Sequence, residues 1–101
     1  MNPGERIVRL MITGRVQGVG FRAFVEEEAY RRKLRGWVRN RRDGAVETVL
    51  SGPTEAVATA VEAIRRGPSA SRVKSVDVQE AETTALEQLL PGEDFSVLPT
   101  A

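Results

Sequence analysis

The chain has 101 residues, of which 41% are hydrophobic and 29% charged, and its formal net charge is +1. This balance predicts one globular domain, residues 1–101, and the charge is too small to indicate nucleic acid or a membrane surface as a partner. The absence of Cys and His excludes disulfides, metal sites built on these residues and covalent catalysis through either side chain.

The first half of the chain predicts a strand, a helix and a hairpin. Apolar residues alternate over residues 6–13, which is typical of a strand with one buried face. From Phe21 the apolar spacing changes to that of an amphipathic helix. Residues 36–50 predict a β-hairpin in which Asp43 and Gly44 form a two-residue turn.

The second half predicts a further helix and two strands. Residues 51–68 have the apolar stripe of a helix, with Pro53 in its first turn. Residues 72–79 alternate again and predict a strand, and residues 95–98 predict a short strand at an edge of the sheet. Residues 82–94 form either a short helical turn or a loop, and the pattern leaves both open.

The resulting order β-α-β-β-α-β predicts an α+β, ferredoxin-like (split βαβ) two-layer sandwich. We expect an antiparallel sheet of four strands plus a short edge strand, with two helices on one face. In this topology the first two strands are parallel and the third lies between them, so their C-terminal ends reach the same edge. Arg22, after the first strand, and Asn40, at the end of the second, are therefore predicted to be neighbours.

Residues 14–22, GRVQGVGFR, are unusually rich in glycine and lie between the first strand and the first helix. Such a loop lets backbone N–H groups approach an anion, and a helix start without a capping side chain leaves further N–H groups free. The pattern therefore indicates a phosphate site. The alternative is that Gly14, Gly18 and Gly20 only form a tight turn, and the loop alone leaves both interpretations open.

This loop and the segment GWVRNRRDGAVE, residues 36–47, together resemble the two signature segments of the acylphosphatase family. Length and element order agree over almost the whole chain. The resemblance implies a small hydrolase of carboxyl–phosphate mixed anhydrides that uses no metal and no cofactor. It implies a phosphate-binding arginine at Arg22, which is also catalytic, and a catalytic, water-orienting asparagine at Asn40. The implied phosphate cradle is the backbone of Gln17, Gly18, Val19, Gly20 and Phe21.

The available side chains fit this chemistry independently. A phosphomonoesterase must help an alkoxide leave, usually with an acid or a metal, whereas an acyl phosphate loses a carboxylate that needs no proton. The sequence offers no His or Cys, and no carboxylates with the spacing of a metal site. We therefore expect an acyl phosphate as substrate and inorganic phosphate as product, with Asn40 orienting water through its amide and not acting as a base.

Several other residues have predicted structural roles. Lys33 stands at the end of the first helix where many relatives have glycine, which predicts a left-handed conformation there. Trp37 is expected to pack on the sheet face opposite Asn40. The arginines that follow are expected to be solvated residues of the strand and turn: Arg39, Arg41 and Arg42.

Three other functions remain to be separated from this one. A non-enzymatic anion-binding or regulatory module could have the same fold. An RNA-binding module of the RRM kind has the same element order, but it needs aromatic residues on the open sheet face, and the chain has five aromatics in all. The chain could also correspond to the acylphosphatase-like head of larger carbamoyl-transfer proteins. We expect a free-standing and monomeric enzyme. We also expect it to be cytoplasmic, because no apolar run has the length of a signal peptide core or a membrane span.

Overall fold

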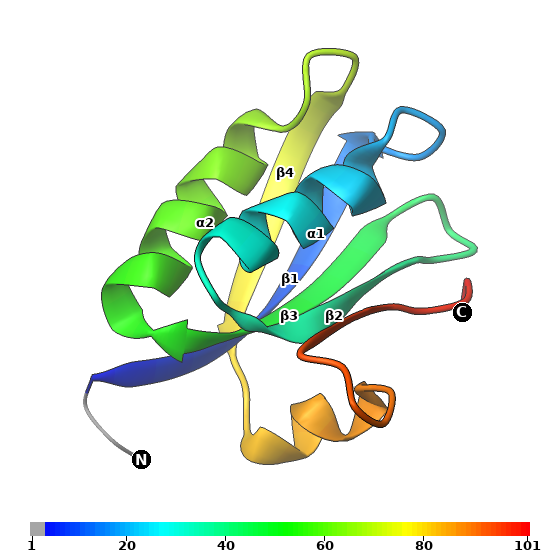
Figure 1. The fold of residues 1–101 in the computed structure, drawn as a ribbon. Helices are drawn as coiled ribbons and strands as arrows, with labels where there is room; N and C mark the ends of the chain where they lie inside the picture. The colour runs from blue at the N-terminus through cyan, green and yellow to red at the C-terminus, as the bar shows by residue number, and fades with distance from the viewer. Residues whose placement is uncertain (1–3) are drawn as a thin grey trace.

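The computed structural model describes residues 4–101, which form one five-stranded sheet with two α-helices on the same face and a 3-10 helix at the other side (Figure 1). Neither α-helix is long and apolar enough to cross a membrane. In chain order the elements are β1 (Glu5–Arg15), α1 (Phe21–Arg31), β2 (Arg35–Asn40), β3 (Val46–Pro53), α2 (Thr54–Arg66), β4 (Arg72–Glu80), the 3-10 helix η1 (Thr83–Gln88) and β5 (Phe95–Val97).

The strands follow the order β4-β1-β3-β2-β5. Strand β3 is antiparallel to both β1 and β2, so β1 and β2 are parallel and end at the same edge of the sheet. The short strand β5 pairs with β2 in parallel, from Gly36 opposite Phe95 to Val38 opposite Val97. The predicted ferredoxin-like fold is confirmed, with β5 as the expected extra edge strand.

The main core lies between the helices and the sheet. Alternate residues of β1, among them Leu10 and Ile12, are fully buried against the apolar stripes of α1 and α2. Burial of one such side chain stabilises the fold by about 1.5–3 kcal/mol. The predicted periodicity of both helices is confirmed, since Val25 of α1 and Ile64 of α2 are also fully buried.

A smaller apolar cluster covers part of the opposite sheet face. Trp37 is 1% exposed and packs with Ile7, Val49 and Leu98. Its indole Nε1 donates a hydrogen bond of 2.7 Å to the carbonyl oxygen of Ala85 in η1. The predicted packing role of Trp37 is confirmed. Of residues 82–94, which the sequence left open between a helical turn and a loop, Thr83–Gln88 form the helix η1 and the others are turn or loop.

Two local predictions were wrong. The hairpin turn is longer than two residues, because the last bond before it joins Arg41 N to Ala45 O at 2.8 Å. Only Gly44 has a positive φ there, whereas Asp43 uses its Oδ1 to accept a 3.0 Å hydrogen bond from Ala45 N. Pro53 precedes the first turn of α2 instead of lying in it, because its extended ψ of 138° ends β3.

The conformation of Lys33 agrees with its prediction. Its φ is 57°, and among residues 4–101 no other residue except glycine has a positive φ. The left-handed turn allows Leu34 N to donate to Ala29 O at 2.8 Å, which directs the chain from α1 into β2. This connection sets the direction of the strand that ends at Asn40.

Candidate active site

The candidate site begins with the loop between β1 and α1. Gly14 does not belong to this loop, because β1 continues past it to Arg15 through an irregularity in the pairing with β4. A Cβ at Gly14 would lie 2.2 Å from the carbonyl oxygen of Arg72, so glycine is required there by close approach. Gly18 and Gly20 have left-handed φ values of 73° and 80°, and a Cβ on either would meet nothing within 4 Å.

The N–H groups of the loop are unpaired. Gly20 caps α1 without a side-chain hydrogen bond, and the first helical bond runs from Phe24 N to Gly20 O. Within the described chain, no N–H group of residues 17–21 donates a hydrogen bond to the protein. Consecutive free N–H groups beside left-handed glycines form a concave, electropositive surface that suits an anion.

A cavity of about 320 Å³ opens beside this loop and brings together the two side chains that the topology predicted to be neighbours. Arg22 reaches it from the first turn of α1, and Asn40 from the end of β2. Six of the remaining lining residues come from the loop and α1, and one comes from β5. They are Val16, Gly18, Gly20, Phe21, Ala23 and Glu26, then Val97.

Gln17 and Val19, which were predicted to contribute backbone to the phosphate cradle, do not line this cavity with their side chains. The Gln17 amide donates to the carbonyl oxygens of Arg41 at 2.7 Å and Ala45 at 2.8 Å. Val19 packs against the main core. Both side chains therefore hold the loop in place, and Gln17 ties it to the hairpin that follows Asn40.

Asn40 is half-buried, and its Oδ1 is a buried atom without a hydrogen-bond partner. Its backbone is held by the end of the chain, since Ala101 N donates to Asn40 O at 3.1 Å and Arg42 N donates to Ala101 O at 2.9 Å. The backbone of Asn40 is thus fixed at the end of β2, while its side-chain oxygen has no partner within the described chain. Buried polar atoms of this kind usually bind water or a ligand.

Arg22 is also half-buried, and its guanidinium makes no hydrogen bond or ion pair within residues 4–101. A phosphate group can therefore bind the planar fork without displacing a protein carboxylate. The described residues contain no group of three acidic, His or Cys side chains that could hold a metal ion.

Four lining residues were not predicted as site residues: Val16, Ala23, Glu26 and Val97. Glu26 lies four residues after Arg22, so helical spacing alone placed it on the same face of α1. Val97 comes from β5, and its position depends on the parallel pairing of β5 with β2. No short-range signal in the sequence indicates that pairing.

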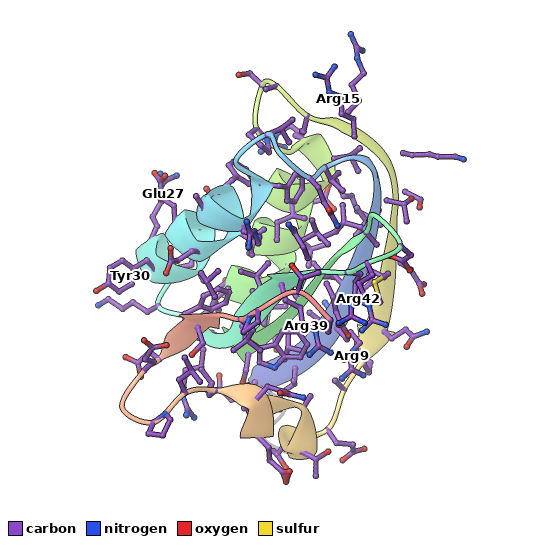
Figure 2. All side chains as sticks on the ribbon, turned by 90° about the vertical axis from the view of Figure 1, so that its right-hand side faces the viewer. Arg9, Arg15, Glu27, Tyr30, Arg39 and Arg42 are labelled. Atoms are coloured by element: carbon purple, nitrogen blue, oxygen red, sulfur yellow. The ribbon has the colours of Figure 1, made fainter. Side chains whose placement is uncertain are left out.

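Of the three arginines expected to be solvated, Arg42 is exposed as predicted, whereas Arg39 and Arg41 are paired. Arg39 and Arg41 both bind Glu47 of β3, at 2.8 and 3.2 Å, and Arg9 approaches the same carboxylate at 3.1 Å. The Glu47 side chain is only 5% exposed. Figure 2 shows Arg9, Arg39 and Arg42 on the side of the sheet opposite α1, so they lie away from the candidate site.

Known proteins resemble this chain in both sequence and fold. The family model described as Acylphosphatase matches residues 8–97. An acylphosphatase of Rhodopseudomonas palustris (strain BisB18) is 56% identical over 93% of this chain and 96% of its own length. The crystal structure of acylphosphatase from Bacillus subtilis has a TM-score of 0.78 and 44% identity, covering 91% of this chain and 97% of that one.

Two further structures extend the comparison. An acylphosphatase from Coxiella burnetii has a TM-score of 0.81 at 30% identity and covers 97% of this chain and all of its own. Full-length HypF in its phosphate- and nucleotide-bound form has the same TM-score at 26% identity, but the match covers only 12% of HypF. Fold, loop and relatives together define a small α+β hydrolase of acid anhydrides. The chain belongs to the acylphosphatase family.

Proposed function

We propose that this hydrolase splits acyl phosphates into a carboxylate and inorganic phosphate with a backbone cradle, one arginine and one asparagine, and without a metal. The cradle consists of the N–H groups of residues 17–21, which bind the phosphoryl oxygens together with Arg22. Asn40 orients the attacking water. The observation that carries the proposal is the buried, unpartnered Oδ1 of Asn40 in the same cavity as the unpaired guanidinium of Arg22.

Arg22 has the task of stabilising charge. As the bond to the leaving carboxylate lengthens, negative charge spreads over the phosphoryl oxygens, and a bidentate guanidinium matches two of them. The neighbouring N–H groups are held by the backbone, so they need no reorganisation during the reaction. Donors that are fixed in advance stabilise the transition state more than the substrate.

Asn40 has the task of positioning. A water molecule that donates one hydrogen bond to Oδ1 keeps its lone pairs free to attack phosphorus on the side opposite the leaving oxygen. The amide is too weak a base to take a proton. In the proposed step the water oxygen bonds to phosphorus, the phosphorus–carboxylate bond breaks, and a phosphoryl oxygen accepts the water's proton.

The leaving group explains why so few side chains suffice. A carboxylate departs as an anion near neutral pH, whereas the alkoxide of a phosphomonoester needs a proton or a metal. The lining residues include one acid, Glu26, and it is exposed to solvent. The site thus favours a mixed anhydride over an ester.

The second candidate function is a non-enzymatic anion-binding module that uses the same cradle. It shares the free N–H groups and Arg22, but it gives no reason for an unpartnered Asn40 oxygen beside them.

We further infer that the chain acts as a monomer, without nucleic acid or membrane, since few large apolar side chains of residues 4–101 are exposed. Light scattering at several protein concentrations tests the monomer.

Incubation of the purified protein with benzoyl phosphate and, separately, with phenyl phosphate tests the proposed function. Both reactions contain EDTA, and released inorganic phosphate is measured. We expect rapid hydrolysis of benzoyl phosphate that EDTA does not affect, and negligible release from phenyl phosphate. Phosphate binding without turnover of benzoyl phosphate would favour the binding module instead, and inactivation by EDTA would overturn the metal-free mechanism.

A further inference from the structure

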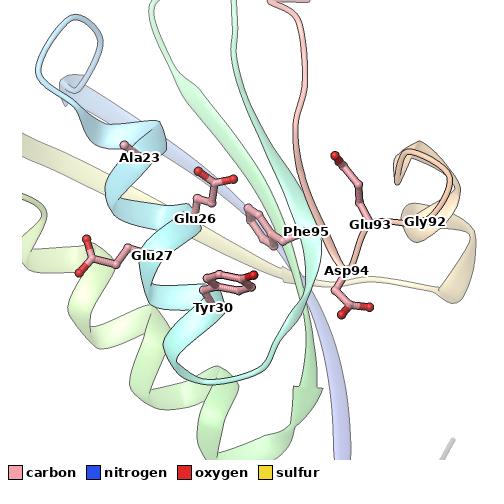
Figure 3. Close-up of a pocket in the computed structure, with 8 residues that line it drawn as sticks. All are labelled: Ala23, Glu26, Glu27, Tyr30, Gly92, Glu93, Asp94 and Phe95. Atoms are coloured by element: carbon pink, nitrogen blue, oxygen red, sulfur yellow. The ribbon is translucent and has the colours of Figure 1, made fainter.

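A second cavity lies directly beside the candidate site. It has a volume of about 670 Å³ and separates α1 from the segment that leads into β5 (Figure 3). Ala23 and Glu26 line both this cavity and the smaller one that contains Arg22 and Asn40. A molecule whose phosphate is bound at Arg22 can therefore extend into the larger cavity without leaving the protein surface.

The larger cavity has an apolar side made of aromatic rings. Figure 3 shows the ring of Phe95 facing α1, with the ring of Tyr30 on the helix beside it. Tyr30 is 83% exposed, although a ring of this size normally packs against something. This arrangement suits the carbon skeleton of an acyl group. We refer to the cavity as the acyl groove and define it by Ala23, Glu26, Tyr30, Glu93 and Phe95.

The acyl groove has a net negative charge. Figure 3 shows the carboxylates of Glu26 and Glu93 on either side of the Phe95 ring. Glu26 has no ion-pair partner within the described chain. Glu93 accepts one hydrogen bond, of 2.6 Å, from the hydroxyl of Ser96. Both carboxylates are therefore available to interact with a bound molecule.

The other acidic residues near the groove contribute less to it. Glu27 also lines the cavity, but its carboxylate is paired with Arg31 at 2.8 Å. Asp94 also lines a neighbouring hollow together with Lys33 and Arg35, so its charge lies near two cations. Glu26 and Glu93 thus determine the charge that an acyl group meets.

We propose that the acyl groove selects acyl phosphates whose acyl part has a cationic group, such as an ammonium, and disfavours those with a second anionic group. This inference rests on the proposed function, because it assigns the leaving part of the same substrate. Arg22 and the loop attract the phosphate, and the two glutamates attract a positive charge at the far end. Such a substrate has opposite charges at its two ends, and so does the site.

Three benzoyl phosphates test the proposal: the unsubstituted compound, its 4-carboxy derivative and its 4-aminomethyl derivative. Their kcat/KM values are measured at low ionic strength and divided by their uncatalysed hydrolysis rates, which removes differences in intrinsic reactivity. We expect the cationic compound to exceed the anionic one by about tenfold, as for unit charges several ångströms apart near a protein surface. The ratio should fall towards one in 1 M salt.

Variants assign the effect to particular side chains. Glu26→Gln and Glu93→Gln should each reduce the cationic-to-anionic ratio to about threefold, and the double variant should bring it close to one. Glu62→Gln, on α2, is the matched control because it changes the net charge equally at an exposed position outside the groove. Its ratio should equal that of the wild type.

The outcomes separate the two proposals. If the unsubstituted compound is not hydrolysed, the proposed function fails and this inference fails with it. If it is hydrolysed but the wild type has a ratio near one, or the double variant keeps the wild-type ratio, only the selectivity of the acyl groove is overturned. If Glu62→Gln lowers the ratio as much as Glu26→Gln, net charge and not the groove is responsible.

Discussion

Arg22 is the second residue of α1. Among the residues that line the cavity beside the glycine loop, it is the one cation, so its replacement tests the proposed phosphate cradle most directly. We expect Arg22→Ala to keep the fold, because the guanidinium makes no hydrogen bond or ion pair with other described residues that an alanine would lose. Turnover of benzoyl phosphate should fall by about 10³-fold, as for other arginines that stabilise phosphoryl transfer. Steady-state kinetics and circular dichroism measure the two effects.

Arg22→Lys is the stricter comparison. The ammonium keeps the charge but loses the planar fork, so we expect most of the activity to be lost as well. A kcat/KM value near that of the wild type in the lysine variant would contradict the assigned role. Unfolding of either variant would show that Arg22 also has a structural function.

Asn40 should affect rate and not phosphate affinity, because its proposed partner is water. We expect Asn40→Ala to lower kcat by about 10²-fold while the Kd for inorganic phosphate, measured by calorimetry, stays close to that of the wild type. Asn40→Asp should be no better, since a carboxylate beside a phosphate dianion repels it. An active aspartate variant would instead identify residue 40 as a base.

At the scale of elements, the loop before α1 and the β2–β3 hairpin act as one unit. Gln17 joins them through its two hydrogen bonds to the carbonyl oxygens of Arg41 and Ala45. We expect Gln17→Ala to cost about 1 kcal/mol of unfolding free energy and to weaken phosphate binding several-fold, because the loop loses its anchor. Gln17→Glu should be worse, since a carboxylate would face two carbonyl oxygens. Unchanged phosphate affinity in both variants would mean that the loop is held by its glycines alone.

The three strands β1, β3 and β2 are joined on their open face by Glu47. Its carboxylate accepts hydrogen bonds from Arg39 and Arg41 and forms an ion pair with Arg9, and Arg39 also lies over the Trp37 ring at 4.7 Å. We expect Glu47→Gln to lower the free energy of unfolding by about 1–3 kcal/mol, because three guanidiniums would lose their common counter-charge.

Urea unfolding measures this difference. The matched control is Glu27→Gln, which breaks a well-exposed ion pair and should change stability by less than about 0.5 kcal/mol. Equal effects of the two substitutions would mean that burial of Glu47 does not strengthen its ion pairs.

At the scale of the whole molecule, the pair formed by Arg6 and Glu80 couples stability to pH. Arg6 of β1 donates hydrogen bonds to Glu80 of the edge strand β4. These hydrogen bonds lower the pKa of the Glu80 carboxyl below its ordinary value of 4.5. A lowered carboxyl pKa stabilises the fold above the unfolded-state pKa, and this contribution is lost as the pH falls through the folded-state value. The pKa of Arg6 is raised by the same hydrogen bonds, so Arg6 stays charged throughout this range.

Wild type and Glu80→Gln should therefore differ at pH 7, and the difference should be smaller at pH 3. Because the pair is largely exposed, the difference at pH 7 should be below about 1 kcal/mol. Urea unfolding at the two pH values measures it. A difference that persists undiminished at pH 3 would mean that packing, and not charge, accounts for the effect of the substitution.

The parts of the fold that depend on nearest neighbours could be predicted from the sequence. Apolar spacing located the helices and strands. Lys33 stands where many relatives of the family have glycine, and this indicated its left-handed turn. The hairpin turn was predicted less well, because an aspartate before glycine can either adopt a positive φ itself or, as Asp43 does, accept a hydrogen bond through its side chain.

The candidate site was predictable only where topology makes distant residues meet. The element order implies that β1 and β2 end at one edge, so the sequence alone determined that Arg22 and Asn40 are close and that a glycine loop lies beside them. Their roles stay predictions until the variants are measured. Tertiary structure alone decided that Val97 completes the cavity, that Asn40 Oδ1 lacks a partner, and that Glu47 gathers three arginines. The physical reason is range: helical and strand periodicity act over a few residues, whereas these contacts depend on pairing and register between strands that are far apart in the chain.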